Sequence, residues 1–364
     1  MRHYCFWSVL ACVLLAAGPA RACSVPVFRY ALERWPAAPY EVYVFHRGPL
    51  SAPHQKAIDR LKAAESSVNL NSVDVAGKLD EEAAKVWQNH AAAALPWLVV
   101  RYPGDFRVPV DAWAGPLAEE NVALLLDSPA RRQVARRLLE GDCGVFVLLE
   151  SGDRGQDEAA ALLLEPELKR LQGSLEIPKP PEGSWGDPVY DQRGAPPLRV
   201  AFSMLRVSRE DPAERLFVKL LTATMPALDR VAMPIVFPIF GRGRVLDALV
   251  GPQIDKDVIE DACAFLVGPC SCIVKSQNPG LDMLMTVDWD AALSGQKSAI
   301  PAVEPPPLTG VGAFASAGAA ERGGPLSSRA ALLTYVLAGV AAGVVILAVA
   351  GVLVWRKARA ASTD

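Results

Sequence analysis

The chain of 364 residues lacks the short motifs that mark several large enzyme classes. It contains no Walker phosphate loop, no dinucleotide-binding glycine fingerprint and no spacing that indicates a Ser/His/Asp set. Gly241-x-Gly243 lacks the third glycine of the fingerprint and follows a predicted hairpin strand. Lysine and arginine are scattered and form no basic stripe interleaved with aromatics, so we expect no nucleic-acid partner. We also expect no cofactor.

Charge is missing from two long apolar runs, one near each end of the sequence. The first, Trp7 to Ala17, follows a short polar start and precedes Ala20-Arg21-Ala22, a small-residue cleavage pattern. This order predicts a secretory signal peptide at residues 1–22. The alternative is a lipoprotein signal in which Cys23 is acylated, and Arg21 weakens that alternative.

The second run, Ala330 to Trp355, contains no charged residue. At about 1.5 Å per residue it exceeds the roughly 30 Å hydrocarbon core of a bilayer. Basic residues follow it directly from Arg356 on, and the positive-inside rule places such residues in the cytoplasm. We therefore predict a single-pass anchor at 329–355 and a cytoplasmic tail at 356–364. The bulk of the chain would be extracytoplasmic, with the membrane as a partner.

A stretch rich in Pro, Ala, Gly and Ser precedes the predicted anchor. Residues 296–328 lack apolar periodicity and include three consecutive prolines from Pro305, a composition typical of a disordered linker. Without signal, linker and anchor, roughly 270 residues remain, which is enough for two domains of ordinary size. We place these domains at 23–127 and 128–295.

Both predicted domains alternate strand patterns with helix patterns. The first has strands at 40–45 and 68–75, helices beginning near Ser51 and Asp80, a proline-led hairpin from Leu95 to Gly115, and a closing helix at 117–126. The second has a helix at 129–139, a strand at 145–149, a helix at 159–171, a strand at 198–207, a helix at 215–222, a hairpin from Met233 to Gly251 and a helix at 255–267. An irregular insertion, rich in proline and glycine, occupies 176–197. The order predicts a parallel strand pair with an antiparallel extension in each domain.

Pro96 and Pro234 each open an apolar strand that leads into a glycine-marked turn, a second strand and a further glycine. This arrangement resembles the second half of the thioredoxin fold. Residues 40–127 and 143–268 thus resemble two tandem thioredoxin-like domains of α/β class, each with a mixed central sheet flanked by helices. The resemblance implies a cis peptide bond before Pro96 and before Pro234.

The resemblance also implies where function would lie, at the junction of the first strand and the first helix of each domain. Catalysis there needs Cys-x-x-Cys, because the helix N-terminus lowers the pKa of the thiol. The two junctions, 46–51 and 150–155, contain no cysteine. A dithiol mechanism at that place is excluded, and Pro96 and Pro234 are left as fold markers and a docking ledge for peptides.

Five cysteines follow the predicted signal: Cys23, Cys143, Cys263, Cys270 and Cys272. An oxidising compartment favours disulfides, and an odd number leaves at least one cysteine unpaired. Cys263 could form a local bridge with Cys270 or Cys272. The Cys-Ser-Cys pair could instead exchange disulfides, or the three thiolates could hold a soft metal ion.

Three histidines and one arginine-containing turn are weaker candidates. His46 and His54 flank the first strand–helix junction, and His90 ends the next predicted helix. They could bind a metal or a ligand, although surface or half-buried structural histidines are more common. Gly241-Arg242-Gly243-Arg244 could hold an anion, but glycines there also serve a hairpin turn.

We therefore expect a membrane-anchored, extracytoplasmic, non-catalytic binding or envelope-assembly module with a protein partner of unknown identity. The alternative is a thiol–disulfide oxidoreductase or metallochaperone that works through Cys270 and Cys272.

Overall fold

The computed structural model describes residues 25–104, 111–178, 198–225, 228–270 and 274–294, all within one compact unit, Met1–Ala302. The predicted signal peptide, linker, anchor and tail lie outside these residues, as do Cys23, Cys272 and most of the 176–197 insertion. Among the described residues, no helix combines the length and the apolar character needed to span a bilayer.

The first module contains a four-stranded sheet in the order β2-β1-β3-β4. Its strands are β1 (Tyr40–His46), β2 (Val68–Asp74), β3 (Trp97–Arg101) and β4 (Asp111–Pro116). Its helices are α3 (Ala52–Lys62), α4 (Glu81–Gln88) and α5 (Glu119–Leu126). β1 pairs with β2 in parallel and with β3 in antiparallel, and β3 pairs with β4 in antiparallel. The predicted mixed sheet is therefore present.

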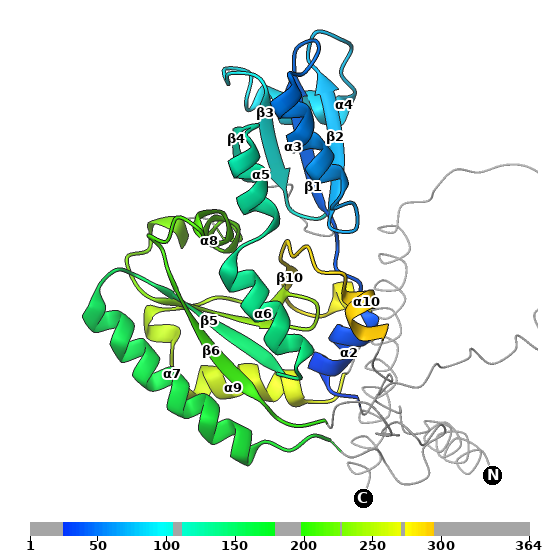
Figure 1. The fold of residues 1–364 in the computed structure, drawn as a ribbon. Helices are drawn as coiled ribbons and strands as arrows, with labels where there is room; N and C mark the ends of the chain where they lie inside the picture. The colour runs from blue at the N-terminus through cyan, green and yellow to red at the C-terminus, as the bar shows by residue number, and fades with distance from the viewer. Residues whose placement is uncertain (1–24, 105–110, 179–197, 226–227, 271–273, 295–364) are drawn as a thin grey trace, which may run out of the picture. The chain divides into compact units, whose positions relative to one another are not determined.

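Alternation along β1 assigns the helices to opposite faces of this sheet. Val42 and Val44 belong to the cluster that includes residues of α3 and α5, whereas Tyr43 and Phe45 pack with residues of α4. Successive side chains of a strand point to opposite faces, so the period of two in β1 produces both cores. Figure 1 shows α3 and α5 alongside this sheet.

The second module contains a six-stranded sheet in the order β10-β8-β7-β5-β6, with β9 paired to β7. Its strands are β5 (Gly144–Glu150), β6 (Phe202–Ser208), β7 (Ile235–Phe240), β8 (Arg244–Val245), β9 (Leu249–Val250) and β10 (Leu281–Asp282). Its helices are α6 (Pro129–Leu139), α7 (Arg154–Ser174), α8 (Arg215–Thr222) and α9 (Lys256–Val267), with single 3₁₀ turns at Leu228–Arg230, Gly251–Gln253 and Lys275–Gln277. β5 pairs with β6 in parallel and with β7 in antiparallel, as in the first module.

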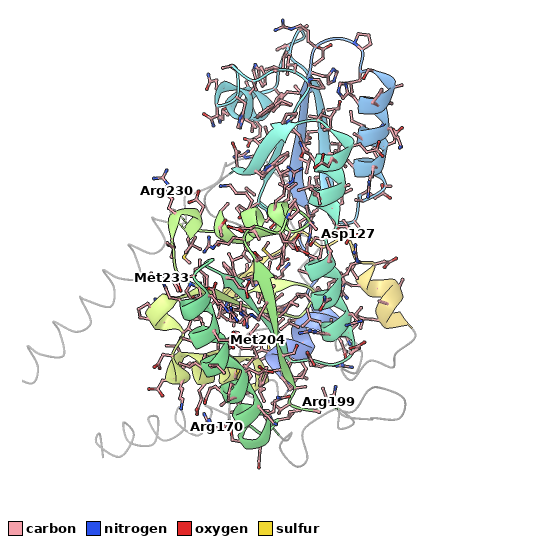
Figure 2. The ribbon with its side chains drawn as sticks, turned by 60° about the vertical axis from the view of Figure 1, so that its left-hand side comes forward. Asp127, Arg170, Arg199, Met204, Arg230 and Met233 are labelled. Carbon is pink, nitrogen blue, oxygen red and sulfur yellow. The ribbon has the colours of Figure 1, made fainter. Side chains whose placement is uncertain are left out.

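Strand β5 divides its side chains in the same way as β1. Phe146 and Leu148 pack with residues of α7 and α9, while Val145, Val147 and Leu149 join the cluster that holds residues of α6 and α8. Every residue of β5 except Glu150 is buried, which explains its unbroken apolar sequence. Met204 on the edge strand β6 and Arg170 on α7 are labelled in Figure 2.

A helix that the sequence patterns missed, α2 (Val27–Arg34), packs on the second module although it precedes the first. The Val27 N–H donates to the Gly268 carbonyl at 3.0 Å, and the Cys270 N–H donates to the Val25 carbonyl at 2.9 Å. Val27, Phe28 and Ala31 lie in the same apolar cluster as residues of α9. This helix therefore belongs to the second module, although its residues lie in the range 23–127 that was predicted for the first domain.

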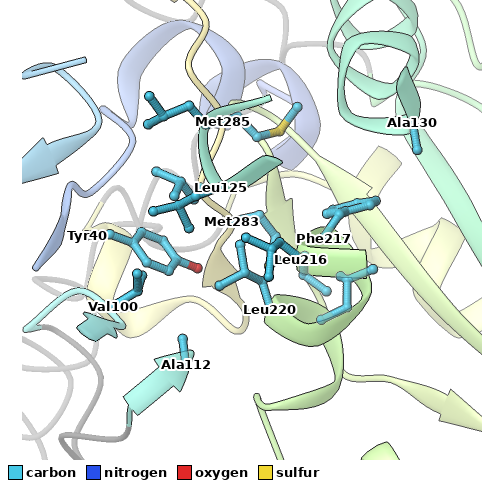
Figure 3. Packing of buried hydrophobic residues seen from close by; sticks show 14 of the residues in the cluster. Tyr40, Val100, Ala112, Leu125, Ala130, Leu216, Phe217, Leu220, Met283 and Met285 are labelled. Atoms are coloured by element: carbon cyan, nitrogen blue, oxygen red, sulfur yellow. The ribbon is translucent and has the colours of Figure 1, made fainter. Parts of the chain in front are cut away.

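Strand β10 and the segment that leads from it to α10 (Trp289–Ser294) contact the first module. The Ser67 hydroxyl donates to the Met285 carbonyl at 3.1 Å, and the Tyr40 hydroxyl donates to the Asp282 carbonyl at 2.9 Å. The resulting cluster draws on both modules and on this segment, as Figure 3 shows for Tyr40, Val100, Ala112, Leu125, Ala130, Leu216, Phe217, Leu220, Met283 and Met285. One continuous apolar core thus joins the two sheets.

Candidate functional site

A groove of about 500 Å³ opens at the junction of β1 and α3. One side comes from the junction and the first turn of α3: His46, Arg47, Pro49, Leu50, Ser51 and His54. The other side comes from α4 and the loop into β3: Trp87, Ala91, Ala93, Leu95 and Pro96. We call this cavity the Pro96 groove. It contains neither a cysteine nor a carboxylate side chain.

His46, the last residue of β1, is held by two neighbours. Its Nδ1 lies 2.8 Å from the Gly48 carbonyl, and its Nε2 lies 3.2 Å from the Ser72 hydroxyl on β2. A carbonyl only accepts, so Nδ1 carries the hydrogen and donates it. The imidazole therefore fixes the turn at Gly48 and forms one wall of the groove.

Ser51 stands at the N-cap position of α3, as predicted, but its side chain makes no capping hydrogen bond. Its hydroxyl instead lies 2.9 Å from Nδ1 of His54. Ser51 is exposed, while His54 is half-buried and lines the groove. No third residue among those described orients the imidazole of His54. The Ser51–His54 pair therefore gives no basis for nucleophilic catalysis.

The apolar side of the groove rests on the core of α4. The ring centroids of Trp87 and Phe45 are 5.0 Å apart, and Trp87 packs against the cluster on that face of the sheet. The Leu95–Pro96 peptide bond is cis, and the Pro96 carbonyl accepts from the Leu117 N–H at 3.0 Å. Trp87 and Leu95 were not predicted as site residues, because only the folded chain brings the end of α4 to the β1–α3 junction.

Asp74, the last residue of β2, binds backbone N–H groups outside the groove. It accepts from the Ala76 N–H at 2.9 Å and from the Gly48 N–H at 3.2 Å. Its pKa is lowered first by the Ala76 hydrogen bond, then by that of Gly48 and by the neighbouring His46 and Arg47. Asp74 thus stabilises the turn as an ionised group.

The corresponding junction of the second module is built differently. Asp157 is 4 % exposed, and its carboxylate accepts from the Ser151 N–H at 2.7 Å, the Ser151 hydroxyl at 2.8 Å and the Gly152 N–H at 3.1 Å. Asp153 caps α7 by accepting from Gly155 and Gln156. Backbone donors at this junction are therefore already bound to carboxylates.

Pro234 does not repeat the geometry of Pro96. Leu95–Pro96 is the one cis peptide bond among the described residues, so the bond before Pro234 is trans, contrary to the prediction. Pro234 precedes β7, so its missing N–H leaves no strand partner unsatisfied in either isomer. Its carbonyl still accepts from Gly251 at 3.0 Å, the counterpart of the Pro96 bond to Leu117.

The cysteines are buried away from both junctions. Cys143, Cys263 and Cys270 are at most 1 % exposed and belong to one apolar cluster. Cys143 and Cys263 are free thiols, so the predicted local bridge from Cys263 to Cys270 or Cys272 is not formed. Cys263 is buried in the core on α9. Desolvation raises the pKa of Cys143 to about 12, and burial raises that of Cys263 as well.

The remaining predicted groups have structural partners. His90 Nε2 lies 2.9 Å from Asp111 Oδ2. In the turn, Arg242 donates to the Leu32 carbonyl at 2.8 Å, and Arg244 donates to Asp282 and to the Pro279 carbonyl, both at 2.9 Å. These guanidiniums hold α2 and β10 in place and do not form an anion site. No three His, Cys, Asp or Glu side chains are grouped as metal ligands within the part of the chain that the structure describes.

A comparison of the sequence with protein-family models and with curated proteins finds no match. Among solved structures, the chain is similar to full-length ERdj5, with 10 % sequence identity and a TM-score of 0.19. The match covers 70 % of this chain and 33 % of that protein, so the chain spans about a third of it. A similarity at this level carries no argument about fold or function.

Proposed function

We propose that the chain is a membrane-anchored, extracytoplasmic, non-catalytic binding module built on two thioredoxin-like domains, and that it binds an extended protein segment in the Pro96 groove. The observation that carries the proposal is the groove itself. It lies at the strand–helix junction where the thioredoxin resemblance places function, and none of its lining residues is a cysteine. Binding is retained there while thiol chemistry is absent.

The sheet orders support the thioredoxin-like assignment. In both modules the first two strands are parallel neighbours, and the third strand pairs antiparallel with the first. The helices also divide alike: α4 lies opposite α3 and α5 in the first module, and α8, together with the additional helix α6, lies opposite α7 and α9 in the second. Two modules with the same placement of elements favour one ancestral fold used twice.

The loop before β3 offers a main-chain surface to a peptide. Neither the N–H nor the C=O of Leu95 forms a hydrogen bond with any residue that the structure describes. Such groups can pair with an extended segment, while Trp87 and Pro96 provide apolar contact beside them. The groove thus combines backbone pairing with an apolar floor.

The proposal is tested with a substitution that fills the groove and leaves its polar residues unchanged. Peptides are selected from a random library against the full-length chain, and their affinities are measured for Ala93→Trp and Ala92→Trp. Ala93 lines the groove, whereas its exposed neighbour Ala92 does not, so the two variants differ only in where the indole projects. We expect Ala93→Trp to weaken binding about tenfold or more and Ala92→Trp to leave it unchanged. Equal peptide affinities of the two variants would contradict the proposal.

The oxidoreductase alternative has a separate test. A thiolate must be accessible to exchange disulfides, but Cys270 is 1 % exposed. Thiol titration of the native chain, before and after mild reduction, should show no change at Cys270 and Cys272. If Cys270 and Cys272 are reduced and reoxidised under thioredoxin-strength reductants, redox exchange and not binding is the function.

Anchoring is tested by truncation. A chain that ends at residue 329 should leave the membrane fraction, while the full chain should resist extraction at alkaline pH. Retention of the truncated chain in the membrane would contradict an anchor at 330–355.

A further inference from the structure

We infer that the partner segment of the Pro96 groove is acidic, with aspartate or glutamate side chains that contact Arg47 and His54. The inference rests on the proposed function, because it names the chemistry of the ligand that this groove would bind. Its evidence is the charge of the lining residues.

Arg47 supplies a fixed positive charge at the rim. It is exposed, lies between β1 and α3, and forms no ion pair with any described residue. A guanidinium stays protonated throughout the physiological range and matches a carboxylate with two parallel N–H donors. Arg47 lies near Asp74, but that carboxylate is bound by the Ala76 and Gly48 N–H groups, so the donors of the guanidinium are available to an acidic side chain in the groove.

His54 adds a second donor on the same side. Its Nδ1 lies 2.9 Å from the Ser51 hydroxyl. When Nδ1 accepts the hydroxyl hydrogen, Nε2 carries the ring hydrogen and donates it outward. No described residue accepts from that nitrogen. The groove thus presents two side-chain donors and no acidic side chain that would repel an anion.

Other cavities of similar size lack this imbalance. The cavity between β4 and α8, about 550 Å³, sets Asp111 and Asp229 against Arg215 and Lys219. The cavity at Thr286, about 540 Å³, and the one beside Lys62, about 440 Å³, also contain aspartates among their lining residues. Among these four cavities, the Pro96 groove is the one whose lining includes a positive side chain and no carboxylate.

The two strand–helix junctions provide an internal comparison. At the second junction the backbone donors are bound by Asp157 and Asp153, so the chain supplies its own carboxylates there. At the first junction, the Gly48 N–H is bound by Asp74, but Arg47 and His54 are left facing the groove. A carboxylate from a partner would bind Arg47 and His54 at the first junction, whereas Asp157 and Asp153 bind the backbone donors of the second.

The test compares two synthetic peptides that differ only in charge. One is a short extended peptide that alternates aspartate or glutamate with valine or leucine, and the other carries asparagine and glutamine at the acidic positions. Their affinities for the full-length chain are measured by fluorescence anisotropy at low salt and at about 0.5 M salt, where exposed charges are screened. We expect the acidic peptide to bind about tenfold more tightly at low salt and to lose most of this advantage at high salt.

Two charge-reversed variants locate the effect. Arg47→Glu should weaken the acidic peptide about tenfold or more and leave the amide peptide nearly unchanged. Arg154→Glu makes the same charge change at the exposed start of α7, at the second junction, and should leave both affinities within about twofold. Thermal unfolding of both variants checks that each remains folded.

The outcomes separate the two proposals. If both peptides bind equally and Ala93→Trp abolishes both, the groove binds peptides without charge preference, and only the acidic-partner inference fails. If Arg154→Glu weakens the acidic peptide as much as Arg47→Glu, net charge and not the groove is responsible, and the inference again fails. If neither peptide binds and the library yields no binder, the proposed function fails together with it.

Discussion

Arginine appears in this protein in two opposite settings. Arg47 is exposed at the groove rim, whereas Arg131 is 3 % exposed inside the core that joins the two modules. The Arg131 guanidinium donates to the carbonyls of Leu124, Leu125 and Leu284 and lies 5.7 Å from the centroid of the Phe217 ring. Desolvation lowers its pKa to about 10, against the opposing charge of Glu214. A buried charge of this kind is stable only because its donors are bound.

Removal of the Arg131 side chain should destabilise the fold strongly. Arg131→Ala leaves buried carbonyls without donors and opens a cavity beside Phe217, so we expect a loss of about 2–4 kcal/mol in the free energy of unfolding. Urea denaturation measures it. The matched control is Arg132→Ala on the same helix, where the exposed pair with Asp127 contributes at most about 1 kcal/mol. Similar losses for both variants would contradict the role assigned to Arg131.

The thiol of Cys143 should make stability fall at high pH. Its pKa is raised by burial from 9.0 to about 12. The folded state therefore keeps the thiol protonated where the unfolded state ionises. Its contribution is complete below about pH 9 and is lost as the pH rises toward 12, with a slope of up to about 1.4 kcal/mol per pH unit.

The comparison variant is Cys143→Ala, unfolded in urea under reducing conditions. Its stability deficit relative to the unmodified chain should shrink between pH 8 and pH 11, because only the unmodified chain carries the titrating thiol. A deficit that stays constant over this range would show that Cys143 does not titrate differently in the two states.

At the scale of elements, equal strand orders produce unequal junctions. The β1–α3 junction is open beside Pro96, while the β5–α7 junction is tied by Asp157. The same contrast appears in the hairpins. Besides β1, β3 pairs with one further strand, β4, whereas the second half of the predicted 233–251 hairpin is split into β8 and β9, which both pair with β7. Side chains near the turns, and not the order of elements, make the two modules differ.

Helix α2 can be tested through a glycine in the turn after β7. Gly241 has φ +57°, and a Cβ there would lie 2.6 Å from the Cβ of Ala31 on α2. Gly241→Ala should therefore cost about 2–4 kcal/mol, the sum of left-handed backbone strain and displacement of the helix. Gly48 has φ +66° but no atom within 4 Å of such a Cβ, so Gly48→Ala should cost only about 1–2 kcal/mol. Equal costs in chemical denaturation would mean that α2 does not pack as described.

For the compact unit Met1–Ala302, the shared core implies cooperative unfolding. The Tyr102 hydroxyl of the first module donates to the Leu220 carbonyl of the second at 2.5 Å, inside the cluster that joins both sheets. The chain also crosses between modules at both ends, through α2 and through the segment after β10. One face of each sheet therefore belongs to a core that the two modules share.

We expect one thermal transition for both modules. In calorimetry of the full chain, the calorimetric and van't Hoff enthalpies of unfolding should agree. Val99→Ala in the first sheet should shift that whole transition to lower temperature, because Val99 is fully buried in the α4-side core. Two resolved transitions, only one of which moves in Val99→Ala, would show that the modules unfold independently.

Local patterns were sufficient to predict most elements. The predicted helices at 129–139 and 215–222 match α6 and α8, and Asp80 caps α4 through a 2.7 Å bond to the Ala83 N–H. Capping, turn residues and apolar periodicity act over a few residues, so they can be recognised in the sequence alone. Helix α2 was missed because it has only eight residues and its N-cap, Pro26, offers no side-chain capping hydrogen bond.

Residue patterns along the chain were therefore enough to predict the succession of strands and helices, the two mixed sheets and the lack of cysteine at either strand–helix junction. Long-range packing was needed to bring Trp87 and Leu95 to Arg47 and His54 around one groove. Packing also places Cys263 in the core without a bridge and binds the arginines of the 241–244 turn internally. The physical reason is range: hydrogen bonds and periodicity within an element depend on neighbours in sequence, whereas a cavity and its charge depend on side chains that only long-range packing brings together.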